Sequence, residues 1–185
     1  MARPEILHLI DTASLGGVNP LLESLSAHGS SRFGLHVASL AATGPMAERL
    51  APGTRFVALG ARTRRDWARA AWQLGRYLRR ERIALVQTHL FASSLVGVAA
   101  ARLAGIRVVV TTHHSIELLV TPSRVWRHVE RANLRHGASF LSAPSERVAT
   151  RLQEAYDLSP ERVTVVPYWF ELSRWRAAAA RRDAM

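Results

Sequence analysis

The sequence predicts an α/β protein, a single domain built on a doubly wound, Rossmann-like parallel sheet of about seven strands. Short apolar segments alternate with helical segments along almost the whole chain of 185 residues. These apolar segments are apolar on both faces, as strands are when helices cover both sides of a parallel sheet. The length suits one sizeable core and is short for two.

The first half of the chain predicts four strands and the helices between them. Residues 5–11 (EILHLID) form the first strand, and a helix begins at about Pro20, with Asn19 as its N-cap. Further strands are expected at 33–40, 54–60 and 83–89, with a short helix at 46–50 and a long one at about 64–82. In the long helix, apolar residues recur at helical spacing and predict one buried face: Trp67, Ala71, Leu74 and Leu78.

The second half predicts three more strands. An apolar helix at 91–105 is closed by Gly105. Strands are expected at 106–114, 138–143 and 162–167, separated by helices at about 123–135 and 144–156. The domain is expected to span 1–167, with 168–185 as a linker or terminal helix.

Composition bounds the class of protein. The formal net charge is +11 and the chain contains no Lys. An Arg-for-Lys bias with abundant Ala is what a GC-rich genome produces, so the charge is a weak functional signal, although a basic surface favours anionic partners. The absence of Cys excludes disulfides and thiolate metal sites. No apolar run reaches the roughly 20 residues of a membrane span, and the first residues do not read as a signal peptide; a cytoplasmic location is expected.

Ligands of such sheets bind at the carboxyl ends of the strands. There the sequence places a Gly16-Gly17 turn, His89, the pair His113-His114, and Ser145. A dinucleotide dehydrogenase would need a G-x-G-x-x-G turn and an acid ending the second strand, whereas this chain reads SLGGVNPLL and SLAATG there. A hydrolase elbow of the form G-x-S-x-G is absent. No carboxylate stands beside the histidines at a familiar ligand spacing, so no metal is expected.

Five segments, in order, resemble the N-terminal domain of GT-B glycosyltransferases of family 4. These segments are ILHLIDTASLGGVNPLLESL, RYLRRERIALVQTHL, AGIRVVVTTHHS, LSAPSERVATRL and LSPERVTVVPYWFELSRW. Together they cover nearly the whole chain. The resemblance implies one half of a GT-B architecture whose second, donor-binding domain lies outside these 185 residues.

The resemblance also implies roles for individual residues. Gly16 and Gly17 would approach the donor diphosphate or the transferred sugar, because only glycine lets a backbone come so close and a helix start favours an anion. His114 matches the family's sugar-proximal His and is the expected catalytic residue, so His114→Ala is expected to lower turnover and leave the melting temperature nearly unchanged. Acceptor contacts are expected from the remaining candidates: His89, His113, Asn19 and Ser145. A purely structural role stays open for each residue, since Gly-Gly turns and strand-end histidines are often structural.

Two functions of different classes follow. The first is the acceptor-binding half of a retaining, hexosyltransferase-like glycosyltransferase that uses a nucleotide-sugar such as a UDP- or GDP-sugar, needs no cofactor and is inactive as the 185-residue chain alone. The alternative is a non-catalytic binding or interaction module that kept the fold and lost the donor domain. Expected partners are the nucleotide-sugar, the acceptor, a donor domain in cis or in trans, and an anionic surface at the inner face of the membrane. Nucleic acid is not expected, because the interleaved aromatics of such proteins are missing.

Overall fold

The computed structural model describes residues 3–14, 16–29, 32–114 and 123–168. The seven strands are β1 (Glu5–Ile10), β2 (Gly34–Ser39), β3 (Arg55–Ala58), β4 (Ile83–His89), β5 (Val108–Thr112), β6 (Phe140–Ala143) and β7 (Val163–Val165). The α-helices are α1 (Asn19–His28), α2 (Trp67–Arg80), α3 (Phe91–Ala104), α4 (Arg124–Ala132) and α5 (Glu146–Tyr156). Short helical turns add η1 (Pro45–Arg49), η2 (Arg64–Asp66), η4 (Asn133–Gly137) and η5 (Pro160–Arg162).

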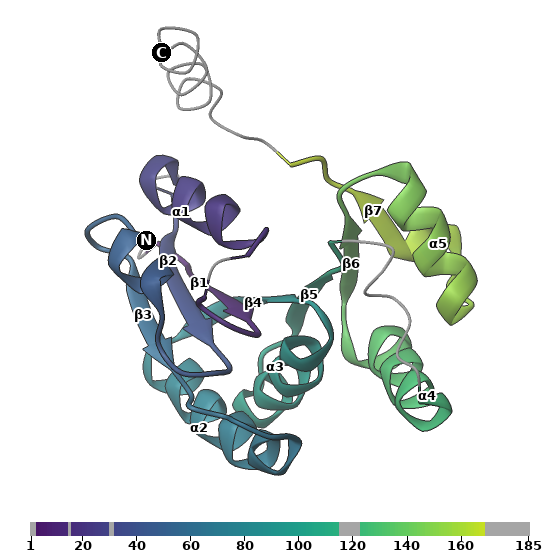
Figure 1. Ribbon diagram of the computed structural model, residues 1–185, viewed down its shortest axis with the longest axis horizontal. Helices are drawn as coiled ribbons and strands as arrows, with labels where there is room; N and C mark the ends of the chain where they lie inside the picture. The colour runs from purple at the N-terminus through teal and green to yellow at the C-terminus, as the bar shows by residue number, and fades with distance from the viewer. Residues whose placement is uncertain (1–2, 15, 30–31, 115–122, 169–185) are drawn as a thin grey trace, which may run out of the picture.

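All seven strands form one parallel sheet in the order β3-β2-β1-β4-β5-β6-β7 (Figure 1). The order reverses between β1 and β4, which is the topological switch point where ligands of doubly wound sheets bind. The predicted fold class and strand number are therefore confirmed.

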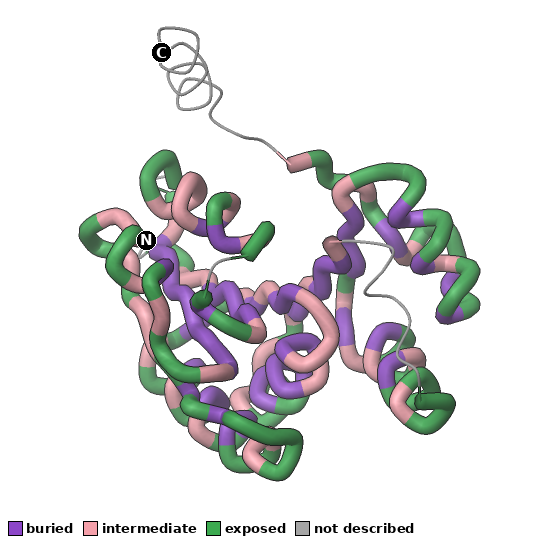
Figure 2. Tube along the Cα trace, viewed as in Figure 1, coloured by how far each residue is buried: buried purple, intermediate pink, exposed green. Residues whose placement is uncertain are grey.

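Helices cover both faces of the sheet, which explains why β2 is buried throughout and β1 along its last four residues (Figure 2). On one face α1 and η1 pack over β1 and β2, with Leu22 and Met46 buried against Ile10 and Val37. On the other face α2 and α3 pack over Leu7, Leu9 and Val86. A second group of side chains fills the space between η4, β6, α5 and β7 on the right of Figure 1.

Close packing of α3 explains its apolar character. It packs against α2 on one side, η4 on another and strands β1, β4 and β5, so it has no wide solvent face. At Gly97 an added Cβ would come within 2.3 Å of Thr88 Cγ2 and 3.2 Å of Leu9 Cδ2. Gly105 follows the helix with a φ of 76°, the left-handed conformation that ends many helices, as the sequence predicted.

Every predicted helix and strand up to Pro167 is present, with ends displaced by a few residues. One local expectation was wrong: Asn19 is not the N-cap of α1. Val18 takes that position, and the Asn19 side-chain amide instead donates to the carbonyl of Ser14. The proposed boundary between domain and linker remains a prediction, since residues 169–185 lie outside the described part.

Candidate functional site

The glycine turn after β1 opens onto a small pocket at the carboxyl edge of the sheet. The pocket has a volume of about 80 Å³ and is lined by Ile10, Asp11, Thr12, Ser14, Gly16, Gly17, Val18, Asn19 and Leu90. An added Cβ at Gly16 would meet nothing nearer than 3.9 Å, and at Gly17 nothing within 4 Å. Neither glycine has the left-handed backbone that excludes other residues. Nothing described in the protein itself therefore requires glycine at these two positions.

Asp11 ties this turn to the start of α3. Its Oδ1 accepts a hydrogen bond of 2.7 Å from the backbone amide of Ser93 and lies 2.5 Å from the Ser93 hydroxyl. A carboxylate at a helix N-terminus is stabilised by the unpaired amides and the helix dipole. Burial nevertheless raises the pKa of Asp11, against the effect of these hydrogen bonds. The link fixes the carboxyl end of β1 relative to that of β4.

Leu90 has a strained backbone at the same place. Its φ of 75° and ψ of −174° lie in a region that side chains with a Cβ rarely adopt. Leu90 joins β4 to α3 and lines the glycine-turn pocket. Such strain is often found at functional sites because the surrounding structure must hold it in place.

Three histidines and a tyrosine form a hydrogen-bonded row across the sheet, called the histidine chain below. His8 Nδ1 lies 3.0 Å from His89 Nε2, and His89 Nδ1 lies 2.8 Å from His114 Nε2. His114 Nδ1 is hydrogen-bonded to the hydroxyl of Tyr168. Successive rings lie nearly parallel, with interplanar angles of 18, 24 and 21° and centroid separations of 5.3, 5.0 and 5.5 Å. The predicted residues His89 and His114 are thus in direct contact.

These imidazoles are neutral at neutral pH. Burial lowers the pKa of His8 and of His114 to about 4. Burial, with the neighbouring imidazoles, holds the pKa of His89 well below its usual value. The chain therefore offers polar nitrogen atoms without a positive charge.

A pocket of about 150 Å³ lies beside this chain, between α1 and the strand ends. It is lined by His8, Leu21, Leu22, Leu25, Gln87, His89, Thr112, Ser142, Val166, Pro167 and Tyr168. Its polar side includes a second cross-strand row in which Gln87 Nε2 donates to Thr112 Oγ1 at 2.9 Å and Thr112 Oγ1 lies 2.7 Å from Ser142 Oγ. No lining residue carries a formal charge at neutral pH, so the pocket suits a neutral, hydroxyl-bearing group.

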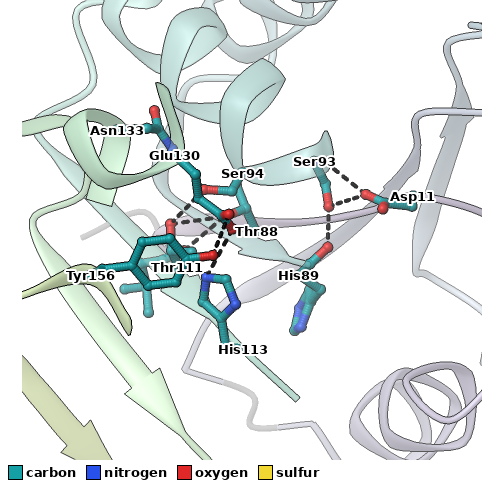
Figure 3. A network of polar contacts seen from close by, with 11 residues as sticks. Asp11, Thr88, His89, Ser93, Ser94, Thr111, His113, Glu130, Asn133 and Tyr156 are labelled. Atoms are coloured by element: carbon teal, nitrogen blue, oxygen red, sulfur yellow. Dashed lines mark hydrogen bonds and ion pairs between the residues drawn. The ribbon is translucent and has the colours of Figure 1, made fainter. Parts of the chain in front are cut away.

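His113 points to the opposite face of the sheet from His114, because successive side chains of an extended strand alternate. It is 3% exposed, and its Nε2 lies 3.9 Å from Glu130 Oε1 (Figure 3). Neither atom has a hydrogen-bond partner among the described residues, whereas Glu130 Oε2 accepts a hydrogen bond from the Tyr156 hydroxyl. The acceptor role of His113 stays a prediction to which this buried position lends no support.

The Glu130 carboxyl is 1% exposed, and burial raises its pKa to about 7. Since its ordinary pKa is 4.5, the folded protein binds this proton more tightly than the unfolded chain does. The stability that protonated Glu130 contributes is therefore present at low pH and lost as the pH rises through 7. Burial lowers the pKa of His113 to about 4 and acts in the opposite direction.

Glu130→Gln is accordingly expected to gain stability relative to the unmodified chain as the pH rises from 5 to 8. Gln keeps the shape and an acceptor for Tyr156 but never ionises, and the part of the pKa shift that develops between pH 5 and 8 corresponds to roughly 2 to 3 kcal/mol. Urea unfolding of both proteins at several pH values measures the difference. A difference that is constant with pH would contradict this assignment.

The other predicted residues have structural contacts of their own. Ser145 is the N-cap of α5, where its hydroxyl accepts a hydrogen bond of 3.4 Å from the Val148 amide. Asn19 is 5% exposed and bonded to the glycine turn. Their predicted acceptor contacts stay predictions.

Sequence reasoning missed His8, Asp11 and Tyr168 at this rim, and Glu130 beside His113 on the other face of the sheet. His8 and Asp11 lie in the first strand and just after it, where they read as ordinary strand residues.

No described group of three or more His, Asp or Glu side chains is arranged to hold a metal ion. No described helix is long and apolar enough to cross a membrane.

Comparison with known proteins gives a family match and several structural matches. The family model of Glycosyltransferase Family 4 matches residues 15–174. No curated protein sequence matches this chain.

Three solved structures illustrate the shared fold. Anabaena Alr3699/HepE in complex with UDP has a TM-score of 0.71 at 18% identity, covering 91% of this chain and 45% of its own. A glycosyltransferase from Rickettsia africae has a TM-score of 0.68 at 12% identity and covers 100% of this chain and 51% of its own. A UDP-GlcNAc 2-epimerase from Methanocaldococcus jannaschii has a TM-score of 0.58 at 14% identity, covering 89% and 45%. The chain thus spans about half the length of these proteins.

Proposed function

Because the chain belongs to Glycosyltransferase Family 4, we propose that it is the acceptor-binding half of a retaining glycosyltransferase that uses a nucleotide-sugar donor. The fold is that of one half of a GT-B enzyme, as the sequence predicted. HepE has been solved with UDP and with UDP-glucose, which supports a nucleotide-sugar as the donor here.

The observation that carries the proposal is the unexplained glycine pair. Gly16 and Gly17 are required neither by packing nor by backbone conformation, and they stand immediately before the N-terminus of α1 at the switch-point edge. A ligand that must approach the backbone explains them, because any side chain would fill that open space. A diphosphate is the expected ligand, since helix N-termini bind anions.

The two pockets are proposed to bind different substrates. The glycine-turn pocket would take the phosphate side of the donor. The uncharged pocket beside the histidines would take a hydroxyl-bearing acceptor, which its neutral imidazoles, hydroxyls and amide suit. We assign His114, which is hydrogen-bonded to two residues that line the uncharged pocket, His89 and Tyr168, as the group nearest the transferred sugar. We propose that no metal or other cofactor takes part. Release of nucleoside diphosphate by a two-domain enzyme, measured with and without His114, tests this assignment.

A basic helix supports a second partner, the anionic surface of a membrane. α2 buries Ala70, Ala71, Leu74, Gly75 and Leu78 and leaves its arginines exposed. Trp72 is 53% exposed, and the Arg76 guanidinium lies 4.9 Å from its ring centroid. We propose that this face contacts anionic headgroups at the cytoplasmic side of a membrane.

The membrane proposal predicts binding to anionic but not to neutral vesicles at low salt. Replacing Arg76 and Arg79 by Gln should weaken binding by roughly thirtyfold, because each basic residue near the surface contributes about 1 kcal/mol. The matched control replaces Arg147 and Arg151, two exposed arginines of α5, and should bind as the unmodified chain does. Cosedimentation measures both, and equal pelleting with neutral and anionic lipid would end the proposal.

A further inference from the structure

The histidine chain follows from strand register. His8 pairs with Gln87 across β1 and β4, and His89 pairs with Thr112 across β4 and β5. His89 therefore lies two residues after Gln87, the partner of His8, and His114 lies two residues after Thr112, the partner of His89. A displacement of two keeps all three side chains on the same face, and diagonal neighbours of this kind lie within reach of large rings.

The chemistry of neutral imidazole makes the chain directional. A neutral ring has one N–H donor and one bare acceptor nitrogen. His89 and His114 each use both nitrogens in this chain. If His89 donates from Nδ1, then His114 accepts at Nε2 and must donate from Nδ1 to Tyr168. If Tyr168 donates instead, each of the three histidines carries its ring proton on Nε2 and accepts at Nδ1.

We propose that His8, His89 and His114 form a single tautomer relay, in which His8 and His89 are positioning residues that decide which nitrogen of His114 carries its proton. The relay has two states, one in which every bond points from His8 toward Tyr168 and one in which every bond points back. It rests on the proposed function only in naming His114 as the residue at the reacting sugar.

The relay bears on what His114 can offer a substrate. Its Nε2 is held by His89, so Nδ1 is the nitrogen that remains once Tyr168 is displaced. In one state this nitrogen donates a hydrogen bond to a substrate oxygen, and in the other it accepts one from a hydroxyl. His8, which does not contact His114, therefore helps decide between two kinds of interaction at the site.

Variants at the two ends should force opposite states. In His8→Phe, His89 Nε2 has lost its partner. A buried N–H without an acceptor is costly, so His89 should carry its proton on Nδ1. In Tyr168→Phe the same reasoning leaves His114 Nδ1 bare, so His114 donates from Nε2 and His89 must carry its proton on Nε2. The tautomer ratio of His89 should differ by at least about tenfold between the variants, the size expected for one hydrogen bond.

The experiment is nitrogen-15 NMR of the full chain labelled at histidine, in which protonated and bare ring nitrogens have distinct shifts. His36 provides the matched control: it is 1% exposed on β2 and bonded to Tyr77 and Glu5, outside the relay. His36→Phe should leave the protons of His89 and His114 where they are in the unmodified chain. The same His89 tautomer in both end variants would overturn the relay.

A second measurement needs no variant and holds if His8→Phe fails to fold. In the unmodified chain, couplings across the hydrogen bonds should join His8 Nδ1 to His89 Nε2 and His89 Nδ1 to His114 Nε2. Observation of both supports the relay, and absence of either overturns it. Because neither measurement involves sugar transfer, failure of the relay is distinguishable from failure of the proposed function.

Discussion

His114→Ala is expected to lower the turnover of a two-domain enzyme containing this chain by about 10² to 10⁴-fold, the range lost when a positioned catalytic group is removed. The side chain lies just past the carboxyl end of β5, hydrogen-bonded to two residues that line the uncharged pocket. Steady-state release of nucleoside diphosphate per folded molecule is the measurement.

The structure adds a stability cost that sequence reasoning did not expect. Loss of the imidazole leaves His89 Nδ1 buried without its partner, which costs about 1 to 3 kcal/mol. For a chain of this size the melting temperature should fall by roughly 3 to 10 °C. Activity must therefore be expressed per folded molecule.

His36→Ala separates the two effects. His36 is buried, as His8 and His89 are, and has two hydrogen-bonding side-chain partners, the Tyr77 hydroxyl at 2.8 Å and Glu5 Oε2 at 3.0 Å. Its removal should lower the melting temperature by a similar amount and leave turnover per folded molecule intact. If the two variants have the same turnover, His114 is a structural residue only.

The order of elements was predictable because it depends on local patterns. Each short apolar segment predicts a strand, Gly105 predicts a helix end, and the spacing of Leu74 and Leu78 predicts the long helix. The parallel sheet follows from the alternation of strands with helices. The rim was predictable to the same extent, since carboxyl ends of parallel strands meet at one edge. His89 and His114 lie there as expected.

The partners of those residues depend on register between distant strands, which no local pattern reveals. His8 meets His89 across 81 positions of sequence. The pair His113-His114 reads as one motif, yet strand alternation sends the two rings to opposite faces. Glu130 stands in a helix between Arg127 and Arg131, a pattern typical of a solvated helix face. It is nevertheless buried and accepts a hydrogen bond from Tyr156.

Alone, the 185-residue chain is expected to transfer no sugar. It spans about half the length of its structural relatives, and the proposed site has one wall, formed by the glycine turn and the histidine chain. Stabilisation of a leaving diphosphate requires several preorganised donors in a site that excludes water. An open rim also loses the positioning of donor against acceptor. Weak binding of an acceptor to the uncharged pocket should survive.

A donor-binding domain supplied in cis or in trans is expected to restore transfer, because it supplies the second wall of the site. Continued silence with that domain, under conditions in which the donor domain binds its nucleotide-sugar, would favour a non-catalytic binding module with the same fold. His114→Ala in the completed enzyme is the control that ties any restored activity to this chain.

Nucleoside diphosphate release from a panel of nucleotide-sugars and acceptors tests the central claim most directly. The chain is assayed alone, with a family 4 donor domain, and with that domain and His114→Ala. The account predicts background release from the chain alone, turnover when the donor domain is present, and loss of that turnover in the variant. Turnover by the chain alone, above that of its own His114→Ala variant, would contradict it.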